Sequence, residues 1–212
     1  TAEEPTRFGI GCLGSRMLAG ALPPAAAVKL RDSAGHDLNY WREQGGCAGE
    51  LESVQLARAA YAGFVELHIE QGPILERENV AIGVVEKIAA PSTLHLELTG
   101  VGGHAGAVLM PERHDALLAG AEIALAVEQA AKASGSADTV ATTGVFRIEP
   151  GAVNSVPCRA HLEIDLRDTQ LSSRDAALER IGRTVLEICA RRGVAFQLQR
   201  LNADAPAVCD VQ

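Results

Sequence analysis

Apolar and polar residues alternate along several stretches of the second half of the chain. Residues 94–100 (LHLELTG) and 159–168 (RAHLEIDLRD) have this two-residue period, which is typical of strands with one face in water. Residues 194–201 (VAFQLQRL) repeat it, and residues 139–157 predict a further strand that runs into a loop. The second half of the chain is therefore predicted to contain four strands.

Two further stretches have apolar residues at helical spacing. One is an Ala/Leu-rich segment that begins near Pro111, and the other is residues 172–193, with a serine as N-cap and a glycine at its end. From residue 92 to residue 201 the order is strand, helix, strand, strand, helix, strand. That order predicts an α+β split βαβ (ferredoxin-like) domain, a four-stranded antiparallel sheet with helices over one face.

The first part of the chain has a different pattern. Residues 51–62 have helical spacing and lead into an apolar run at 64–70 (FVELHIE), which predicts a strand that breaks at Gly72-Pro73. Residues 81–91 (AIGVVEKIAAP) predict another strand, rich in β-branched residues. Strands that are apolar throughout are typical of sheets buried on both faces, so we predict that this part belongs to a second domain.

Composition limits the classes of partner. The chain has 212 residues, of which 47% are apolar, enough to bury a core. Its formal net charge is -8 without a long Lys/Arg run, so we expect neither nucleic acid nor membrane as a partner. Five cysteines without CxxC spacing predict buried or free thiols. The chain starts at Thr1 rather than Met, which indicates a processed or truncated product.

Several polar residues in the first part stand where chemistry could use them. Glu3 and Glu4 are adjacent; such a pair is usually solvated charge, but one carboxylate could bind a metal while its neighbour carries a proton. His68 lies in a predicted apolar strand, where a histidine is more often bonded to backbone than to a metal. Glu66 and Glu70 would share its face of the strand, so this face is either wet or binds something.

Three more candidates lie in the second half of the chain. His104 follows a glycine-rich stretch that lacks the sequence patterns of nucleotide-binding sites. This stretch is either a turn without a ligand, or a turn whose glycines let the imidazole approach a ligand closely. Asn154 lies in the loop PGAVNSVP. Arg167 either forms a surface ion pair with Asp165 or grips a carboxylate with its planar guanidinium.

Five motifs together resemble the amidase, hydantoinase and carbamoylase branch of the zinc-peptidase-like metallohydrolases. In chain order they are EEPTRFGIGCLGSRMLAG, ELHIEQGPILE, IGVVEKIAAP, GGHAGAVLMPERHDA and PGAVNSVPCRAHLEIDLRD. The resemblance implies an α/β fold class in which residues 1–91 are part of a metallohydrolase catalytic domain. Residues 92–201 would be a lid and dimerisation domain of a homodimer, and residues 202–212 would begin the return to the catalytic domain.

The resemblance also implies a metal site and a chemistry. Two divalent metal ions, manganese favoured and zinc possible, would polarise a ureido carbonyl and acidify a shared water. Glu3 would accept the proton of this water, and Glu4 and His68 would be metal ligands. Family members have further metal ligands upstream and downstream that this chain lacks, so we expect the chain alone to bind metal weakly and to be inactive.

The implied substrate is a small ureido acid whose C–N bond is hydrolysed with release of ammonia. Gln71 would face this substrate, Arg167 and Asn154 would hold its carboxylate, and His104, supplied by the other subunit, would lie near the carbonyl. Gly103 before His104, and Ala-Val-Leu after HAG, differ from the Asn and Thr-Thr-Pro typical of carbamoylases. This difference favours ureidoglycolate over N-carbamoyl amino acids, with allantoate as the other alternative.

Two further expectations stay open at this point. A non-enzymatic alternative is a dimerisation module, in which the helix that begins near Pro111 and its sheet edge form the contact. Plant members of the family imply the endoplasmic reticulum as the compartment.

Overall fold

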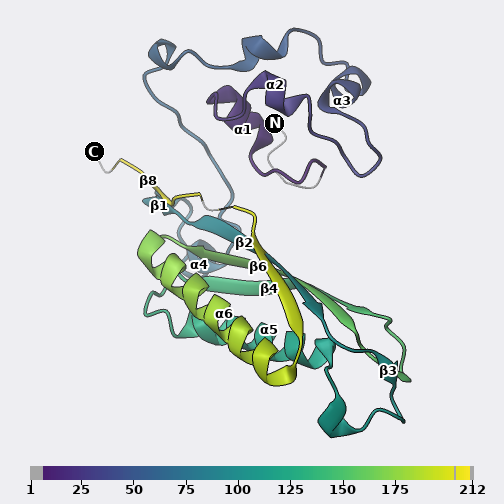
Figure 1. Ribbon diagram of the computed structural model, residues 1–212. Coiled ribbons are helices and arrows are strands. Elements are labelled where there is room, and N and C mark those ends of the chain that lie inside the picture. Colours follow the sequence, from purple (N-terminus) through teal and green to yellow (C-terminus); the bar gives the residue numbers. More distant parts are fainter. Residues whose placement is uncertain (1–6, 203, 211–212) are drawn as a thin grey trace. The chain divides into compact units, whose positions relative to one another are not determined.

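The structure, a computed structural model, describes residues 7–202 and 204–210 (Figure 1). The chain divides after Pro73 into two compact units, Thr1–Pro73 and Ile74–Gln212, each of which is described by itself. The sequence-based boundaries at residues 91 and 201 concern functional domains and stay predictions.

The larger unit is built on a four-stranded antiparallel sheet. Its strands are β2 (Ala90–Thr99), β4 (Val140–Glu149), β6 (Arg159–Asp168) and β7 (Ala195–Arg200), in the order β4-β6-β2-β7. Two helices, α5 (Ala116–Lys132) and α6 (Leu171–Arg192), cover one face of the sheet (Figure 1). The succession of elements and the strand order agree with the predicted split βαβ arrangement.

Side-chain alternation decides which face of this sheet is buried. In β2 and β6 the even-numbered residues are at most 4% exposed, whereas the odd-numbered residues are partly or largely exposed. The buried apolar residues of the two strands that belong to the main core are Leu94, Leu96, Leu98, Ala160, Leu162, Ile164 and Leu166. These residues pack against α5 and α6, so the strand period predicted at 94–100 and 159–168 is confirmed.

The two ends of α6 give different outcomes for the predictions. Gly193 has φ 63°, in the left-handed region that favours glycine, and it ends the helix as predicted. The predicted serine N-cap is wrong, because the helix begins at Leu171 and contains both serines. Gln170 is the N-cap and no side chain caps the helix; the backbone N–H of Gln170 donates to Oδ1 of the buried Asp168 (2.7 Å).

The other long helix begins later than its sequence predicts. A short 3-10 turn, η3 (Met110–Glu112), occupies the region of Pro111, and α5 starts at Ala116. Asp115 is the N-cap of α5, since its Oδ1 accepts a hydrogen bond from Leu118 N (3.1 Å). Within the described residues, no helix combines the length and the apolar character needed to cross a membrane.

The smaller unit is helical. It contains α1 (Leu13–Leu18), α2 (Pro24–Ala27), α3 (Leu38–Gln44), η1 (Leu51–Val54) and η2 (Arg58–Ala60). A small core of buried residues holds it together, formed by Leu13, Met17, Ala27 and Leu51. The helix predicted over residues 51–62 is wrong, because this stretch forms only the two 3-10 turns.

Two strands predicted before the sheet are also absent or much shorter than predicted. Residues 64–70 form no strand. In the larger unit α4 (Ile74–Arg77) comes first, and then only β1 (Lys87–Ile88), which pairs with β8 (Ala207–Val208), and the start of β2 are strand within residues 81–91. A strand needs a partner for its backbone N–H and C=O groups, and in this region the described residues supply one only to β1, through β8, and to the start of β2, through β6.

The close approach of two backbone segments at Gly100 gives a stability prediction. A Cβ at this position would lie 1.9 Å from the carbonyl oxygen of His114, and backbone cannot swing aside as a side-chain end can. We expect Gly100→Ala to lower the free energy of unfolding by about 2 kcal/mol or more, measured by urea unfolding of the chain. The control is Gly182→Ala in α6, where a Cβ meets nothing within 4 Å; it should raise stability by about 0.5–1 kcal/mol. Equal stability of the two variants would contradict the described packing.

Candidate functional site

A short two-stranded arm carries two of the predicted substrate-binding residues. β3 (Gly103–His104) pairs with β5 (Ser155–Val156), and His104 lies opposite Ser155. Beside this pair, the backbone N–H of Ala105 donates to the carbonyl of Asn154 (2.9 Å). The pairing therefore brings the exposed residues His104 and Asn154 next to each other at one end of the larger unit (Figure 1).

The imidazole of His104 has a defined hydrogen-bond partner. The backbone N–H of Gly106 donates to its Nδ1 (3.1 Å). With Nδ1 as the acceptor, the proton of the neutral ring is on Nε2, which can donate to a carbonyl oxygen. The guanidinium of Arg113 donates to the carbonyls of Val108 (3.1 Å) and Ala105 (2.5 Å), which ties together the loop that follows His104.

Arg167 lies near the opposite end of β6 from this arm. Its Nε donates to Asp165 Oδ2 (2.7 Å), so the ion pair considered from the sequence is present; the Arg167 side chain is 52% exposed and that of Asp165 37%. From Arg159, where β6 begins after β5, to Arg167 the strand rises by eight residues, or about 26 Å at ~3.3 Å per residue. One chain therefore does not bring Arg167 together with His104 and Asn154.

The predicted metal ligands and proton carrier are not assembled in the described residues. His68 and Gln71 are exposed in the smaller unit, and His68 Nδ1 lies 2.5 Å from the carbonyl oxygen of Ile69, the next residue. Glu3 and Glu4 lie outside the described residues. Among residues 7–202 and 204–210, no group of three or more His, Cys, Asp or Glu side chains could hold a metal ion.

The open face of the sheet carries a polar cluster that sequence reasoning missed. β2 and β6 both contain His-Leu-Glu, and the antiparallel register sets His161 opposite Glu97 and His95 opposite Glu163. His161 Nδ1 lies 2.6 Å from Glu97, and its Nε2 lies 3.0 Å from Glu163. His95 Nε2 lies 3.6 Å from the other oxygen of Glu163. The repeated tripeptide is the sequence signal, but only the register shows that the two copies meet.

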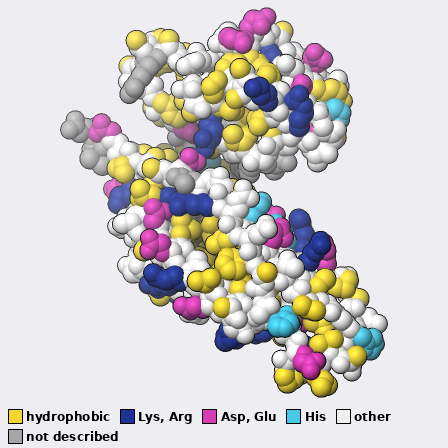
Figure 2. Space-filling view, viewed as in Figure 1, with side chains coloured by type: hydrophobic (Ala, Val, Ile, Leu, Met, Phe, Trp, Pro, Cys, Tyr) yellow, Lys and Arg dark blue, Asp and Glu magenta, His cyan; other side chains and the backbone are white. Residues whose placement is uncertain are grey.

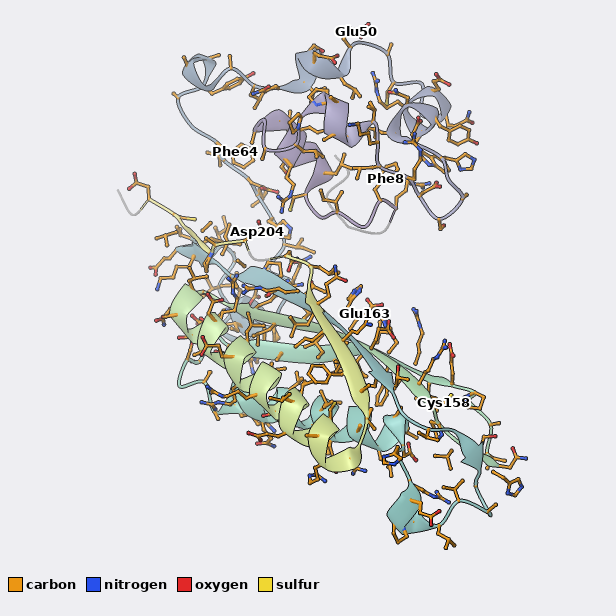
Figure 3. All side chains as sticks on the ribbon, in the orientation of Figure 1. Phe8, Glu50, Phe64, Cys158, Glu163 and Asp204 are labelled. Atoms are coloured by element: carbon orange, nitrogen blue, oxygen red, sulfur yellow. The ribbon has the colours of Figure 1, made fainter. Side chains whose placement is uncertain are left out.

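This cluster is visible on the surface of the larger unit. A histidine lies beside acidic and basic side chains in Figure 2, on the part of the surface where Glu163 is labelled in Figure 3. A hollow of about 310 Å³ adjoins it, lined in part by Glu97, Thr99, Arg159 and Gln197. None of the predicted site residues that the structure describes lines this hollow.

The contacts within the cluster shift two pKa values. The hydrogen bond with Glu163 raises the pKa of His161; partial burial opposes this shift, and Glu97 adds to it. The same hydrogen bond lowers the pKa of Glu163. A histidine whose pKa is higher in the folded state than in the unfolded state stabilises the fold. This stabilisation is fully present below the unfolded pKa of about 6.5, and it is lost as pH rises through the folded pKa.

The chain is similar in sequence to a set of hydrolases. It is 47% identical to ureidoglycolate hydrolase of Oryza sativa subsp. japonica, over 99% of this chain and 44% of the relative. It is 36% identical to N-carbamoyl-L-amino acid amidohydrolase of Geobacillus stearothermophilus, over 99% of this chain and 51% of the relative. The chain thus spans about half the length of the curated relatives it matches. No family model matches it.

The chain is also similar to solved structures of such hydrolases. The structure of AtUAH in complex with glyoxylate matches 99% of this chain and 51% of its own, with a TM-score of 0.85 and 47% identity. An amidase of the hydantoinase/carbamoylase family from Burkholderia phymatum matches 99% of this chain and 51% of its own, with a TM-score of 0.82 and 30% identity. Both matches extend over both units of the chain.

The His161 cluster gives a prediction of pH dependence. NMR titration of the chain should give His161 a pKa above 6.5, and Glu163→Gln should lower it, because the principal partner of the charged ring is lost. Glu128→Gln, at an exposed position of α5, is the control and should leave this pKa unchanged. In urea unfolding, the stability advantage of the wild type over His161→Gln should shrink as pH rises through the folded pKa of His161. A pKa at or below 6.5 in the wild type would contradict the described contacts.

Proposed function

Because the chain is similar in sequence and structure to amidases of the hydantoinase/carbamoylase family, we propose that it is part of a ureidoglycolate amidohydrolase. The resemblance of its motifs to that branch is confirmed by relatives at 47% and 48% identity over 99% of the chain, both named ureidoglycolate hydrolase. The carbamoylase of Geobacillus stearothermophilus is 36% identical, and a probable allantoate deiminase of Oryza sativa is 31% identical. The higher identity to the ureidoglycolate hydrolases than to the carbamoylase and the allantoate deiminase is the observation on which we base the choice of ureidoglycolate as substrate.

The proposed reaction is hydrolysis of the ureido C–N bond. Water adds to the ureido carbonyl, ammonia leaves, and the carbamate that remains loses carbon dioxide to give hydroxyglycine. Hydroxyglycine then breaks down to glyoxylate and a second ammonia. AtUAH has been solved in complex with (S)-hydroxyglycine and with glyoxylate, the two acids that this sequence of steps produces.

Arg167, Asn154 and His104 are the proposed substrate contacts in the larger unit. The bond from Arg167 to Asp165 uses Nε, so the outer edge formed by Nη1 and Nη2 can take a carboxylate in two places. The Nε2–H of His104 can donate to the ureido oxygen and stabilise the negative charge that develops there as water adds. Gln71 is proposed to face the substrate from the smaller unit.

The separation of these residues supports a site shared by two subunits. About 26 Å of strand lies between Arg167 and the end of β6 that leads to the arm of His104, well beyond the span of a ureidoglycolate molecule. If both residues contact one substrate, His104 is supplied by a second copy of the chain. A two-fold homodimer would build two such sites, each with Arg167 of one subunit and His104 of its partner.

The larger unit has a surface suited to such a homodimer. Among the described strands, β4 lies at the edge of the sheet, next to β6. Phe146 and Ile148 on this strand are 38% and 36% exposed, and Leu118 and Leu125 on α5 are 40% and 64% exposed. We therefore propose that α5 and the edge strand β4 form the dimer contact. The same surface would serve in the non-enzymatic alternative, a dimerisation module, with residues 92–201 as the associating domain.

The proposed cofactors are two divalent metal ions, with manganese favoured and zinc possible. Glu4 and His68 are the proposed ligands in this chain, and Glu3 is the proposed proton carrier. The described residues do not themselves assemble a metal site, so the remaining ligands would come from the half of the relatives' length that this chain does not span.

An assay of the full-length protein that contains this chain tests the proposal. With manganese present, ammonia release should be fastest with ureidoglycolate, compared with allantoate and N-carbamoyl amino acids. Arg167→Lys should raise KM at least about tenfold, because an ammonium cannot hold a carboxylate in two places. Arg159→Lys, on the same strand face, is the matched control and should leave KM unchanged. Preference for either other substrate would refute the proposed specificity.

A further inference from the structure

Arg113 holds together the turn that follows His104. It lies between β3 and α5 (Figure 1), and its side chain is partly buried. Its Nε donates to the carbonyl of Val108 (3.1 Å), and its Nη2 donates to the carbonyl of Ala105 (2.5 Å). Nε and Nη2 form one edge of the planar guanidinium, so a single rigid group of donors joins the start of the turn to its end.

The backbone next to Arg113 is fixed to the packed part of the larger unit. The carbonyl of His114, the following residue, accepts a hydrogen bond from the N–H of Val101 (2.9 Å), just after β2. The ring Nδ1 of His114 lies 3.1 Å from the carbonyl oxygen of Arg192, at the end of α6. Asp115 then caps α5. Arg113 therefore connects an exposed turn to backbone that the sheet and both long helices hold in place.

Main-chain groups of this turn hold the imidazole of His104. The carbonyl of His104 accepts from the N–H groups of Ala107 (2.9 Å) and Val108 (3.1 Å), and its Nδ1 accepts from the N–H of Gly106 (3.1 Å). A Cβ at Gly106 would lie 3.2 Å from Cε1 of His104, so the ring lies close against the backbone at Gly106. The tautomer and the direction of the ring therefore depend on the shape of the turn.

We propose that Arg113 is a positioning residue that acts through His104. By bracing the turn, it keeps Nδ1 of His104 bonded to Gly106 and so holds the Nε2–H toward the ureido oxygen. This inference rests on the proposed function, in which that Nε2–H donates to the oxygen. The donor matters most for the charge that develops as water adds, so a misplaced ring lowers kcat more than it raises KM.

NMR of the chain tests the proposal without substrate. At a pH where the ring of His104 is neutral, its ¹⁵N chemical shifts should show the proton on Nε2 in the wild type. Arg113→Met removes the guanidinium and should move both shifts toward the averaged values of a free imidazole. The matched control is Arg180→Met, because Arg180 also donates to a main-chain carbonyl, that of Ala133 (3.0 Å), and it should leave the shifts unchanged. Wild-type shifts of His104 in Arg113→Met would overturn the proposal.

Kinetics of the full-length protein give a second readout, with ureidoglycolate as substrate. Arg113→Met should lower kcat at least about tenfold and change KM by less than about twofold. Arg113→Lys should recover only part of kcat, because an ammonium cannot hold two carbonyls in the geometry of the planar fork. Arg180→Met should keep the wild-type kcat and KM. A wild-type kcat in Arg113→Met, or a rise in KM alone, would overturn the positioning role.

His104→Ala separates this proposal from the proposed function. If His104→Ala is nearly inactive while Arg113→Met keeps the wild-type kcat, the positioning role fails and the proposed function stands. If His104→Ala is as active as the wild type, the proposed role of His104 in the reaction fails. The ¹⁵N shifts of Arg113→Met then still decide whether Arg113 holds the ring.

Discussion

The pairing of β2 with β6 is the constraint on which the larger unit depends. These two central strands stay in antiparallel register over ten residue pairs, from Ala90 opposite Asp168 to Thr99 opposite Arg159. Because side chains alternate, this register sends every even-numbered residue toward the helices and every odd-numbered residue to the open face. It also fixes where the functional candidates lie, with Arg167 at one end of β6 and the arm of His104 at the other.

The distance between Arg167 and the arm of His104 means that these candidate residues do not form one site within a single chain. In the sequence, His104, Asn154 and Arg167 form one set, and in the structure two of them meet while the third lies a strand length away. A rigid, well-packed sheet does not bend to close such a distance. The subunit contact, rather than a movement within one chain, is therefore the device that would complete the proposed site.

Much of the larger unit was predictable because its signals are local. The alternation in residues 159–168 reflects a strand with one buried face, and β6 has those same bounds. Other features depend on partners that sequence does not reveal. The run at 64–70 has the residues of a strand, but no strand among the described residues pairs with it, and it stays exposed. The two His-Leu-Glu tripeptides form a cluster only because the register between β2 and β6 sets each histidine opposite a glutamate. The roles of Glu3, Glu4 and Gln71 remain predictions, since they need the rest of the protein to be tested.

The central claim is that one active site combines Arg167 of one subunit with His104 of its partner, and subunit mixing tests it most directly. Full-length Arg167→Ala and His104→Ala proteins, each nearly inactive alone, would be unfolded, mixed in equal amounts and refolded together. Random pairing makes half of the dimers mixed, and each mixed dimer would carry one intact site, so the mixture should recover about a quarter of the wild-type activity. A mixture no more active than its two parents would contradict the account.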